Sequence, residues 1–414
     1  METGHGPEEY SFIQEIIKEE KINVKKVGKN VCKWTMLGLV FGMAACLSFH
    51  MLKPWAETRF QQNPDKVEIP TDDELIEDDP VVQEPEQEQE LTIDSYRELN
   101  ILLGEVAVES QKSVVHVSGI KQDQSWITGV DNPSSETTGL IVADNGREIL
   151  ILTNYSSMKE AQLFRVEFAD GSVHEGVMKQ KDGTIDLAIF SVAKSGLTDD
   201  TWNQIKVAML GRSNTFIPGR TLMAIGSPFG LKKGLGYGIA SSVDEIIVRA
   251  DGEYNIIVTD MPESEHGNGF LFDAYGNVIG VIDARLADEA GTSTLAAIGI
   301  SDIKSEIELM SNGKNVPYIG IIGTIVTEEM SEAQGIPAGL YVNEVKVDSP
   351  AMKAGIQSGD IITSVGKTKV VTMKDYHKAV LAQEAGKTVK ITGQRFGAES
   401  YVDIKFNVTV GVVQ

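Results

Sequence analysis

LMAIGSPFG at residues 222–230 and GIAS at 238–241 are two apolar runs of the β type on either side of a turn rich in glycine and proline. Strands at such short spacing, without long amphipathic helices between them, predict antiparallel barrels or a sandwich rather than a parallel α/β sheet. The fold class is therefore mainly β. Further runs of the same kind, each ended by turn residues, are VVHVSGI (114–120), TGLIVAD (138–144), ILILTN (149–154), FRVEFADGSVHEGVM (164–178), DLAIFSV (186–192), NIIVTD (255–260) and NVIGVIDA (277–284).

A helix is predicted over residues 299–312, because apolar side chains recur there at helical spacing. Ser301-Asp302 is its candidate N-terminal cap, and Asn312-Gly313 is its expected end. Residues 316–414 form a separate, smaller α+β unit in which strands alternate with short helices near 328–334 and 373–385.

Composition limits the possible functions. The 414 residues carry 37 basic and 60 acidic side chains, a formal net charge of −23. Binding to nucleic acid is therefore not expected, because it needs a basic face. Both cysteines, Cys32 and Cys46, lie in the first fifty residues, so the rest of the chain has no disulfide, thiolate metal site or cysteine nucleophile. We expect no metal and no cofactor.

An apolar run, WTMLGLVFGMAACLSFHML at residues 34–52, has no formal charge. As a helix it spans about 28 Å, close to the hydrocarbon thickness of a bilayer. Lysines precede it and acidic residues follow, so residues 1–33 are expected in the cytoplasm and the chain after residue 53 outside the cell. A cleaved signal peptide is one alternative. A lipoprotein is another, because Met43-Ala44-Ala45-Cys46 loosely resembles a lipidation site.

Residues 53–95 are rich in proline, glutamine and acids, and 65–90 alone contain twelve acidic residues and one lysine. Such a segment buries too little apolar surface to offset its ordering entropy. We therefore expect a disordered linker between the membrane and the domains that follow.

Over residues 100–414 the chain resembles the HtrA/Do-like, trypsin-fold serine proteases with one C-terminal PDZ domain. The first barrel is indicated by Thr138–Val142, Ile151–Asn154 and Asp186–Ile189, in family order. Ala224–Gly230 with Gly238–Ser241, then Thr259-Asp260 and Gly276–Val281, match the second barrel. The resemblance implies a protease-like double β-barrel over 96–313 and a PDZ domain over 316–414. The family's usual homotrimer is a possible assembly.

The catalytic positions depart from this family. A serine protease needs a serine nucleophile, a histidine base and a carboxylate that orients the histidine. Ser156 follows Thr153-Asn154-Tyr155 where the family has histidine, and Gly267, or Asn268 in a second alignment, stands where it has serine. Only Asp186 is retained. The expectation is a pseudoprotease with Ser156, Asp186 and Gly267 at the cleft between the barrels.

A rebuilt site from Ser264 and His266 is an alternative, but residues two apart point to opposite faces of a strand. Glu263 and Glu265 beside the glycine turn would repel a developing oxyanion, unless they are simply solvated loop residues.

The C-terminal unit retains its family motifs. Tyr318-Ile319-Gly320-Ile321 resembles the PDZ loop whose backbone N–H groups bind a peptide's terminal carboxylate. Gly335–Val342 and Ser349–Ile362 also match the family. Helix 373–383 would line the groove with Tyr376 and Val380. In the alternative interpretation, Ile319, Ile321, Tyr376 and Val380 only fill the domain's core.

Two functions follow from this pattern. The first is a single-pass pseudoprotease on the outer face of a bacterial membrane of the Gram-positive type, anchored in the lipid bilayer by residues 34–52, that binds peptide or protein C-termini as a scaffold in envelope protein quality control. The second is an active HtrA/Do-like serine endopeptidase that degrades misfolded surface proteins.

Overall fold

The computed structural model describes residues 36, 65–72, 92–121 and 135–413. Residues 64–414 form one compact unit. Within the described residues, no helix is both long and apolar enough to cross a membrane. Apart from Met36, the apolar run 34–52 lies outside those residues.

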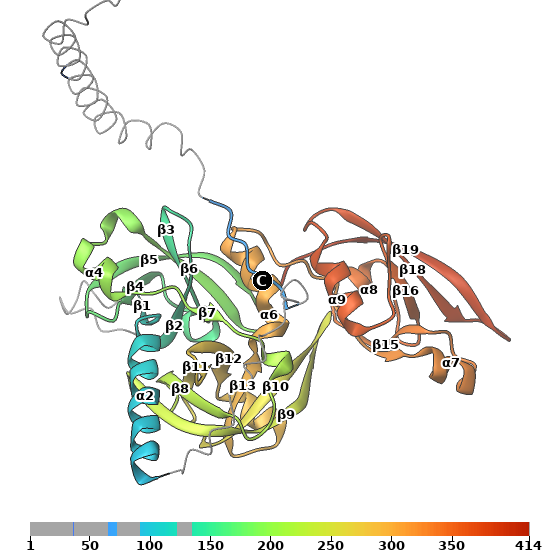
Figure 1. Cartoon of the computed structure of the whole chain (residues 1–414). Helices are drawn as coiled ribbons and strands as arrows, with labels where there is room; N and C mark the ends of the chain where they lie inside the picture. Colours follow the sequence, from blue (N-terminus) through green and yellow to red (C-terminus); the bar gives the residue numbers. More distant parts are fainter. Residues whose placement is uncertain (1–35, 37–64, 73–91, 122–134, 414) are drawn as a thin grey trace, which may run out of the picture. The chain divides into compact units, whose positions relative to one another are not determined.

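Six antiparallel strands close the first barrel in the order β1-β2-β3-β6-β5-β4 (Figure 1). Its strands arise from the runs rich in β-branched residues, and alternate side chains such as Val115, Val117 and Val166 pack inside it. The strands are β1 Val114–Ile120, β2 Ser135–Asp144, β3 Glu148–Asn154, β4 Leu163–Glu167, β5 Val173–Asp182 and β6 Leu187–Ala193.

The second barrel has the order β11-β8-β9-β10-β13-β12, and pairing of β11 with β12 closes the ring. Strand β7, Met209–Leu210, adds to β12 in parallel. A core cluster that contains Leu140 and Leu152 of the first barrel and Ile225 and Phe270 of the second joins the two. The strands are β8 Thr221–Ser227, β9 Gly234–Arg249, β10 Gly252–Pro262, β11 Asn268–Asp273, β12 Asn277–Asp283 and β13 Thr294–Gly299.

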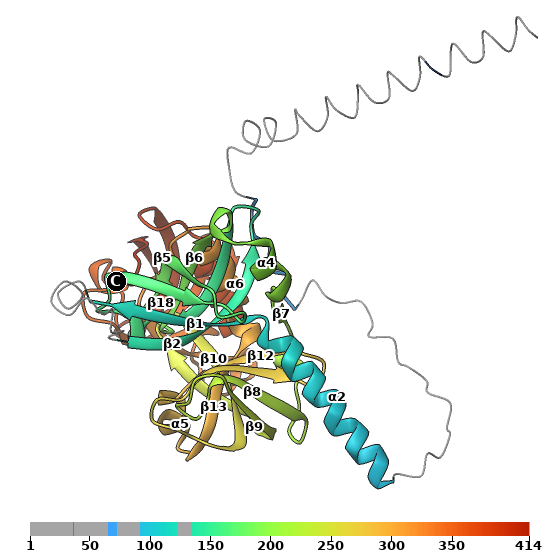
Figure 2. The same ribbon diagram turned by 90° about the vertical axis from the view of Figure 1, so that its left-hand side faces the viewer.

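The longest described helix, α2 at Ile93–Gln111, begins with a capping box made by Thr92 and Ser95. It contacts strands β1 and β8, but only Ala107 and Ser110 near its C-terminal end are buried, and the rest of the helix extends away from the barrels (Figure 2). The sequence did not predict this helix. The other helices and 3₁₀ turns of this part are η1 Ser156–Met158, η2 Lys194–Gly196, α4 Asp199–Gln204, η3 Ser213–Thr215, α5 Arg285–Ala290 and α6 Ile300–Ser311.

The C-terminal domain has a core of its own, which includes Leu340, Ile362 and Val408. Its sheet has the order β14-β15-β16-β18-β19, with β17 paired to β16. The strands and helices are β14 Ile321–Val326, α7 Glu328–Gln334, β15 Gly339–Val345, α8 Pro350–Lys353, β16 Ile361–Val365, β17 Thr368–Lys369, α9 Met373–Leu381, β18 Thr388–Phe396 and β19 Tyr401–Thr409. Helix α9 ends at Leu381, so it is shorter than the helix predicted near residues 373–385.

Helix α6 differs from its prediction at one end. Gly299 is the residue before the first turn, and no side chain caps the helix. Ser301 and Asp302 instead bond other elements: the Ser301 hydroxyl accepts from Ser213 N in η3 at 2.8 Å, and the Asp302 carboxylate accepts from Asn255 N in β10 at 2.7 Å. The cap prediction was wrong because these groups serve tertiary contacts. The predicted end at Asn312-Gly313 is confirmed.

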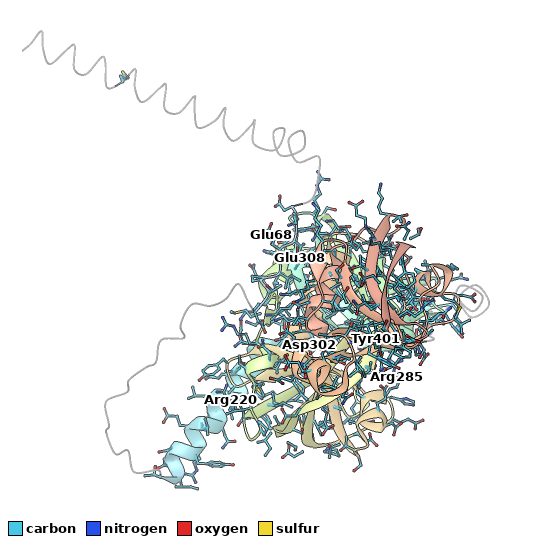
Figure 3. All side chains as sticks on the ribbon, turned by 90° about the vertical axis from the view of Figure 1, so that its right-hand side faces the viewer. Glu68, Arg220, Arg285, Asp302, Glu308 and Tyr401 are labelled. Carbon is cyan, nitrogen blue, oxygen red and sulfur yellow. The ribbon has the colours of Figure 1, made fainter. Side chains whose placement is uncertain are left out.

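Residues 65–72, inside the segment expected to be disordered, pack against α6. Val67 and Ile69 are buried, and their N–H groups donate to the side chains of Asn312 and Glu308 at 2.9 and 3.0 Å. Figure 3 labels Glu68 and Glu308 at this contact. Disorder is therefore the wrong expectation for these eight residues, because their two apolar side chains find a surface far along the chain. Residues 92–95 also belong to the start of α2, and 53–64 and 73–91 lie outside the described residues.

The Asp72–Lys304 ion pair should stabilise this contact. The Nζ atom of Lys304 lies 2.6 Å from Asp72 Oδ1, and both side chains are more than nine-tenths buried. In residues 64–414, Asp72→Asn should lower the free energy of unfolding by about 3 kcal/mol, because it leaves a buried ammonium without its counter-charge. The measurement is urea denaturation. The control, Asp94→Asn, breaks an exposed pair with Arg97 and should change little; equal losses in both variants would contradict the account.

Candidate functional site

Ser156 and Asp186 lie together at the end of the first barrel. Ser156 begins η1 just after β3, and Asp186 immediately precedes β6. The Ser156 N–H donates to Asp186 Oδ1 at 2.8 Å, and its hydroxyl donates to Oδ2 at 2.7 Å. Asp186 has a φ of +59°, a left-handed conformation that is uncommon outside glycine. The retained carboxylate is thus bonded to the residue at the expected histidine position.

Arg285 is the second partner of Asp186. Its Nη2 contacts Asp186 Oδ2 and Asp283 Oδ2, and its Nε donates to Asp283 Oδ1 at 2.9 Å. The hydrogen bond to Asp283, followed by the charges of Asp283 and Asp186, raises the pKa of the Arg285 guanidinium above its already high value. Figure 3 labels this side chain at the first turn of α5. A guanidinium that stays protonated cannot accept a proton, so this cluster contains no general base of the imidazole type.

The histidines of the described residues bond elsewhere or are exposed. His116 lies 3.5 Å from Glu136, His174 contacts Ser172, His377 contacts Glu306, and His266 is exposed. None of these four is bonded to Asp186. In the same described ranges, no three or more His, Cys, Asp and Glu side chains lie together in a group that could hold a metal ion.

Gly267 is buried in the loop before β11, in a conformation that does not suit a serine nucleophile. A Cβ atom built at Gly267 would lie 2.6 Å from the Pro228 carbonyl oxygen. The Gly267 N–H already donates to Ser264 O at 2.7 Å. An oxyanion hole requires donors aimed at the reacting oxygen, and this N–H is used within its own loop. The hollow beside it has a volume of about 10 Å³, room for roughly one water.

Asn268, the second candidate for the serine position, is bonded to strand β2 and to its own loop. Asn268 Oδ1 accepts from Thr138 N at 2.9 Å, and its Nδ2 donates to His266 O at 3.0 Å. No hydrogen bond joins Ser264 to His266 among the described residues. Glu263 and Glu265 are exposed, as solvated loop residues would be. The rebuilt serine–histidine pair is therefore not formed.

A chain of contacts links Ser156, Asp186 and Gly267, the three positions at which the sequence analysis expects the triad. Arg285 joins Asp186 to Asp283, and Asp283 pairs with Asn268 across β12 and β11. Ala284 N donates to Gly267 O at 3.2 Å. Ser156 and Asp186 are thus connected to the Gly267 loop through Arg285 and Asp283.

The loop before β14 binds a carboxylate in this structure. Asp251 Oδ2 accepts from Ile319 N and Gly320 N, each at 2.7 Å, and Asp251 Oδ1 accepts from Ile321 N at 3.0 Å. The Tyr376 hydroxyl donates to Asp251 Oδ1 at 2.7 Å. Gly320 has a φ of +92°, and a Cβ there would lie 2.4 Å from Ser349 Cβ, so the loop requires glycine.

The apolar candidates around this loop are core residues. Ile319, Ile321, Tyr376 and Val380 are all at most 1% exposed. Tyr376 also reaches the bound carboxylate through its hydroxyl, while Tyr318 forms an isolated bridge with Gly411. The loop's N–H groups therefore face the carboxylate, and its side chains support the loop from behind.

Sequence reasoning missed three residues of these sites. Asp283 and Arg285 follow a predicted strand, but nothing local shows that they meet Asp186. Asp251 lies in the dipeptide Asp251-Gly252 between two β-type runs, which is a signal for a hairpin turn. That signal does not reveal which distant surface the turn reaches.

Fold and sites together define a trypsin-fold domain followed by one PDZ domain. Family models agree: residues 137–281 match the trypsin-like peptidase domain and residues 317–406 the PDZ domain. Similar curated proteins include a putative serine protease HhoB from Synechocystis, 29% identical over 70% of this chain and 73% of its own length, and serine protease HTRA1 from Xenopus tropicalis, 28% identical over 76% and 68%. The serine protease Do-like HtrA of Bacillus subtilis is 27% identical over 67% and 64%.

Among solved structures, an HtrA-type protease AlgW with a decapeptide matches with a TM-score of 0.52 and 21% identity, over 75% of this chain and 99% of that one. At this identity the likeness shows the fold. The chain thus contains a trypsin-like domain followed by a single C-terminal PDZ domain, and it is similar to the HtrA/Do-like serine proteases.

Placing a histidine at position 156 and a serine at position 267 should not produce proteolysis. In residues 64–414, Ser156→His with Gly267→Ser should leave casein hydrolysis at background, because Arg285 already pairs with Asp186 and the new serine Cβ meets the Pro228 carbonyl. Release of fluorescent fragments from labelled casein is the readout. The control, Ser156→Ala, should match the unmodified chain. Clear turnover by the double variant above this control would show that the scaffold remains competent.

Proposed function

We propose that this chain is a membrane-anchored HtrA-like pseudoprotease whose PDZ domain binds exposed peptide or protein C-termini. The observation that carries the proposal is the loop Tyr318–Ile321, where three consecutive backbone N–H groups converge on one carboxylate. A peptide's terminal carboxylate presents the same acceptor atoms, so the loop has the chemistry that recognises it.

The sheet beside the loop supports strand addition by a peptide. Strand β14 stands at the end of the sheet order, with β15 as its only strand partner in the described part of the domain. Its outer edge therefore offers backbone groups to an extended peptide, as in other β-augmentation sites. Ile322 and Ile325 on β14 are only partly buried, so this strand offers apolar surface that favours an apolar final residue.

Loss of proteolysis is supported by the other site. Ser156 cannot serve as a base near neutral pH, and Arg285 cannot accept a proton. Gly267 has no nucleophilic atom, and its N–H is bonded inside its loop. Nucleophile and base act as a unit in this chemistry, so the absence of both removes the basis for acyl transfer.

The competing function is an active serine endopeptidase of protein quality control, and the names of the similar proteins favour it. Those names describe the relatives' own activity. The contacts of Asp186 and Gly267 in this chain support a binding role instead, in which the trypsin-like domain carries and positions the PDZ domain.

Anchoring completes the proposal. We place the apolar run 34–52 across the bacterial membrane, residues 1–33 in the cytoplasm, and the two folded domains outside a cell of the Gram-positive type. The support is the uncharged length of the run and the lysines that precede it. In this arrangement the PDZ domain would sample C-termini exposed at the cell surface.

Peptide binding should depend on the terminal charge. The isolated PDZ domain, residues 316–414, should bind peptides that end in a free apolar residue, and amidation should weaken binding at least tenfold. Charge-assisted hydrogen bonds of this kind contribute about 1.5–3 kcal/mol each. The measurement is fluorescence polarisation over a peptide library, with free and amidated forms of each sequence.

A glycine pair provides the matched control. Gly320→Ala should abolish binding, because its Cβ meets Ser349 within the loop. Gly355→Ala makes the same change at a similarly positive φ, where a Cβ has open space, and should bind normally. If no peptide binds, or amidation has no effect, the binding role is wrong.

A further inference from the structure

The β9–β10 hairpin of the trypsin-like domain ends in a two-residue turn, Ala250-Asp251, because Arg249 and Gly252 are paired. Asp251 has a φ of +65°, the left-handed conformation that tight hairpin turns demand. This turn projects Asp251 into the PDZ loop, and Figure 1 shows the end of the hairpin beside α9. The residue is only 4% exposed.

Asp251 makes the contacts expected of a bound ligand. Its carboxylate receives the three loop N–H groups and the Tyr376 hydroxyl. Its own N–H donates to Ile321 O at 2.7 Å, the type of backbone bond that an added strand makes with β14. One residue therefore uses both the charge-binding and the strand-binding features of the loop.

Neighbouring groups hold the hairpin in this position. His377 on α9 lies 2.8 Å from the Asp251 carbonyl oxygen through Nδ1 and 2.8 Å from Glu306 Oε1 through Nε2. Burial lowers the pKa of His377, but the Glu306 carboxylate outweighs it and raises the pKa to about 9. The Tyr254 hydroxyl also donates to Glu306 at 3.2 Å. A cationic His377 can donate to both oxygens and so ties α9 to the hairpin and to α6.

We propose that Asp251 is an internal ligand of the PDZ domain, which occupies the carboxylate loop and must leave before a peptide C-terminus can enter. Three N–H groups cannot hold two carboxylates at once, so the two ligands exclude each other. This inference rests on the proposed function of the loop. Since only the open fraction binds, the closed hairpin lowers the apparent affinity for C-terminal peptides by that fraction.

The variant Asp251→Asn in residues 64–414 tests this inference. Asparagine tolerates the left-handed turn but lacks the charge, and it places an amide N–H₂ group toward the loop donors. Asp251→Gly keeps the turn and removes the side chain altogether. The matched control is Glu245→Gln, which makes the same charge change at an exposed position on the same hairpin.

Two readouts are measured on each protein. The first is binding of the fluorescent peptide library with free and amidated termini. The second is hydrogen exchange at the amides of Ile319, Gly320 and Ile321, which needs no ligand. Both Asp251 variants should bind free-carboxylate peptides roughly tenfold or more tightly than the unmodified protein, and their loop amides should exchange at least tenfold faster. Glu245→Gln should change neither.

The outcomes distinguish internal occupancy of the loop by Asp251 from the peptide-binding function of the PDZ domain. If the unmodified protein and the Asp251 variants bind free-carboxylate peptides equally well, internal occupancy is wrong and the peptide-binding function stands. If loop amides exchange equally fast in all of them, occupancy is also wrong. If the loop amides are protected by Asp251 but no variant and no isolated PDZ domain binds any peptide, the peptide-binding function fails and the contact is a fixed structural joint.

Discussion

A carboxylate that leaves water needs charges or hydrogen-bond donors around it, and this constraint organises both functional sites of the chain. Asp251 is buried, which raises its pKa, while the loop N–H groups and Tyr376 stabilise the charged form. Asp186 is held by Ser156 and by Arg285. In each case the hydrogen-bond donors come from the chain itself, so neither carboxylate needs a ligand or solvent to stabilise its charge.

In the proposed pseudoprotease, the trypsin fold can persist without its chemistry because the two depend on different residues. The cores of the barrels are made of buried aliphatic and aromatic side chains such as Leu152, Phe190 and Phe270, none of which takes part in catalysis. Ser156 and Gly267 are not members of these core clusters, so the proposed loss of catalytic residues at these two positions leaves the cores intact. Arg285 then neutralises Asp186 and Asp283, two neighbouring acids that would otherwise repel each other. Fold and activity can therefore be inherited separately.

Much of this architecture could be predicted from the sequence, because strand runs such as 149–154 and 339–345 contain β-branched residues and are bounded by turn signals. Ser156 and Gly267 were also identified from the sequence as departures from the family pattern, and this remains a prediction. Arg285 and Asp251 were not, because their partners lie far along the chain and no local pattern encodes those meetings. The packing of Val67 and Ile69 was missed for the same reason: the acidic composition around them indicates disorder, and only the surface of α6 changes that outcome.

Reaction with a fluorophosphonate probe tests the central claim most directly, since the probe labels only a serine that is activated as a nucleophile. Residues 64–414, shown to be folded by their denaturation transition, should take up no label at pH 7.5 under conditions in which trypsin is fully modified. Mass spectrometry of the treated protein should show an unchanged mass. A covalent adduct mapped to Ser156, Ser264 or any other serine of the cleft would contradict the account and identify this chain as a working protease.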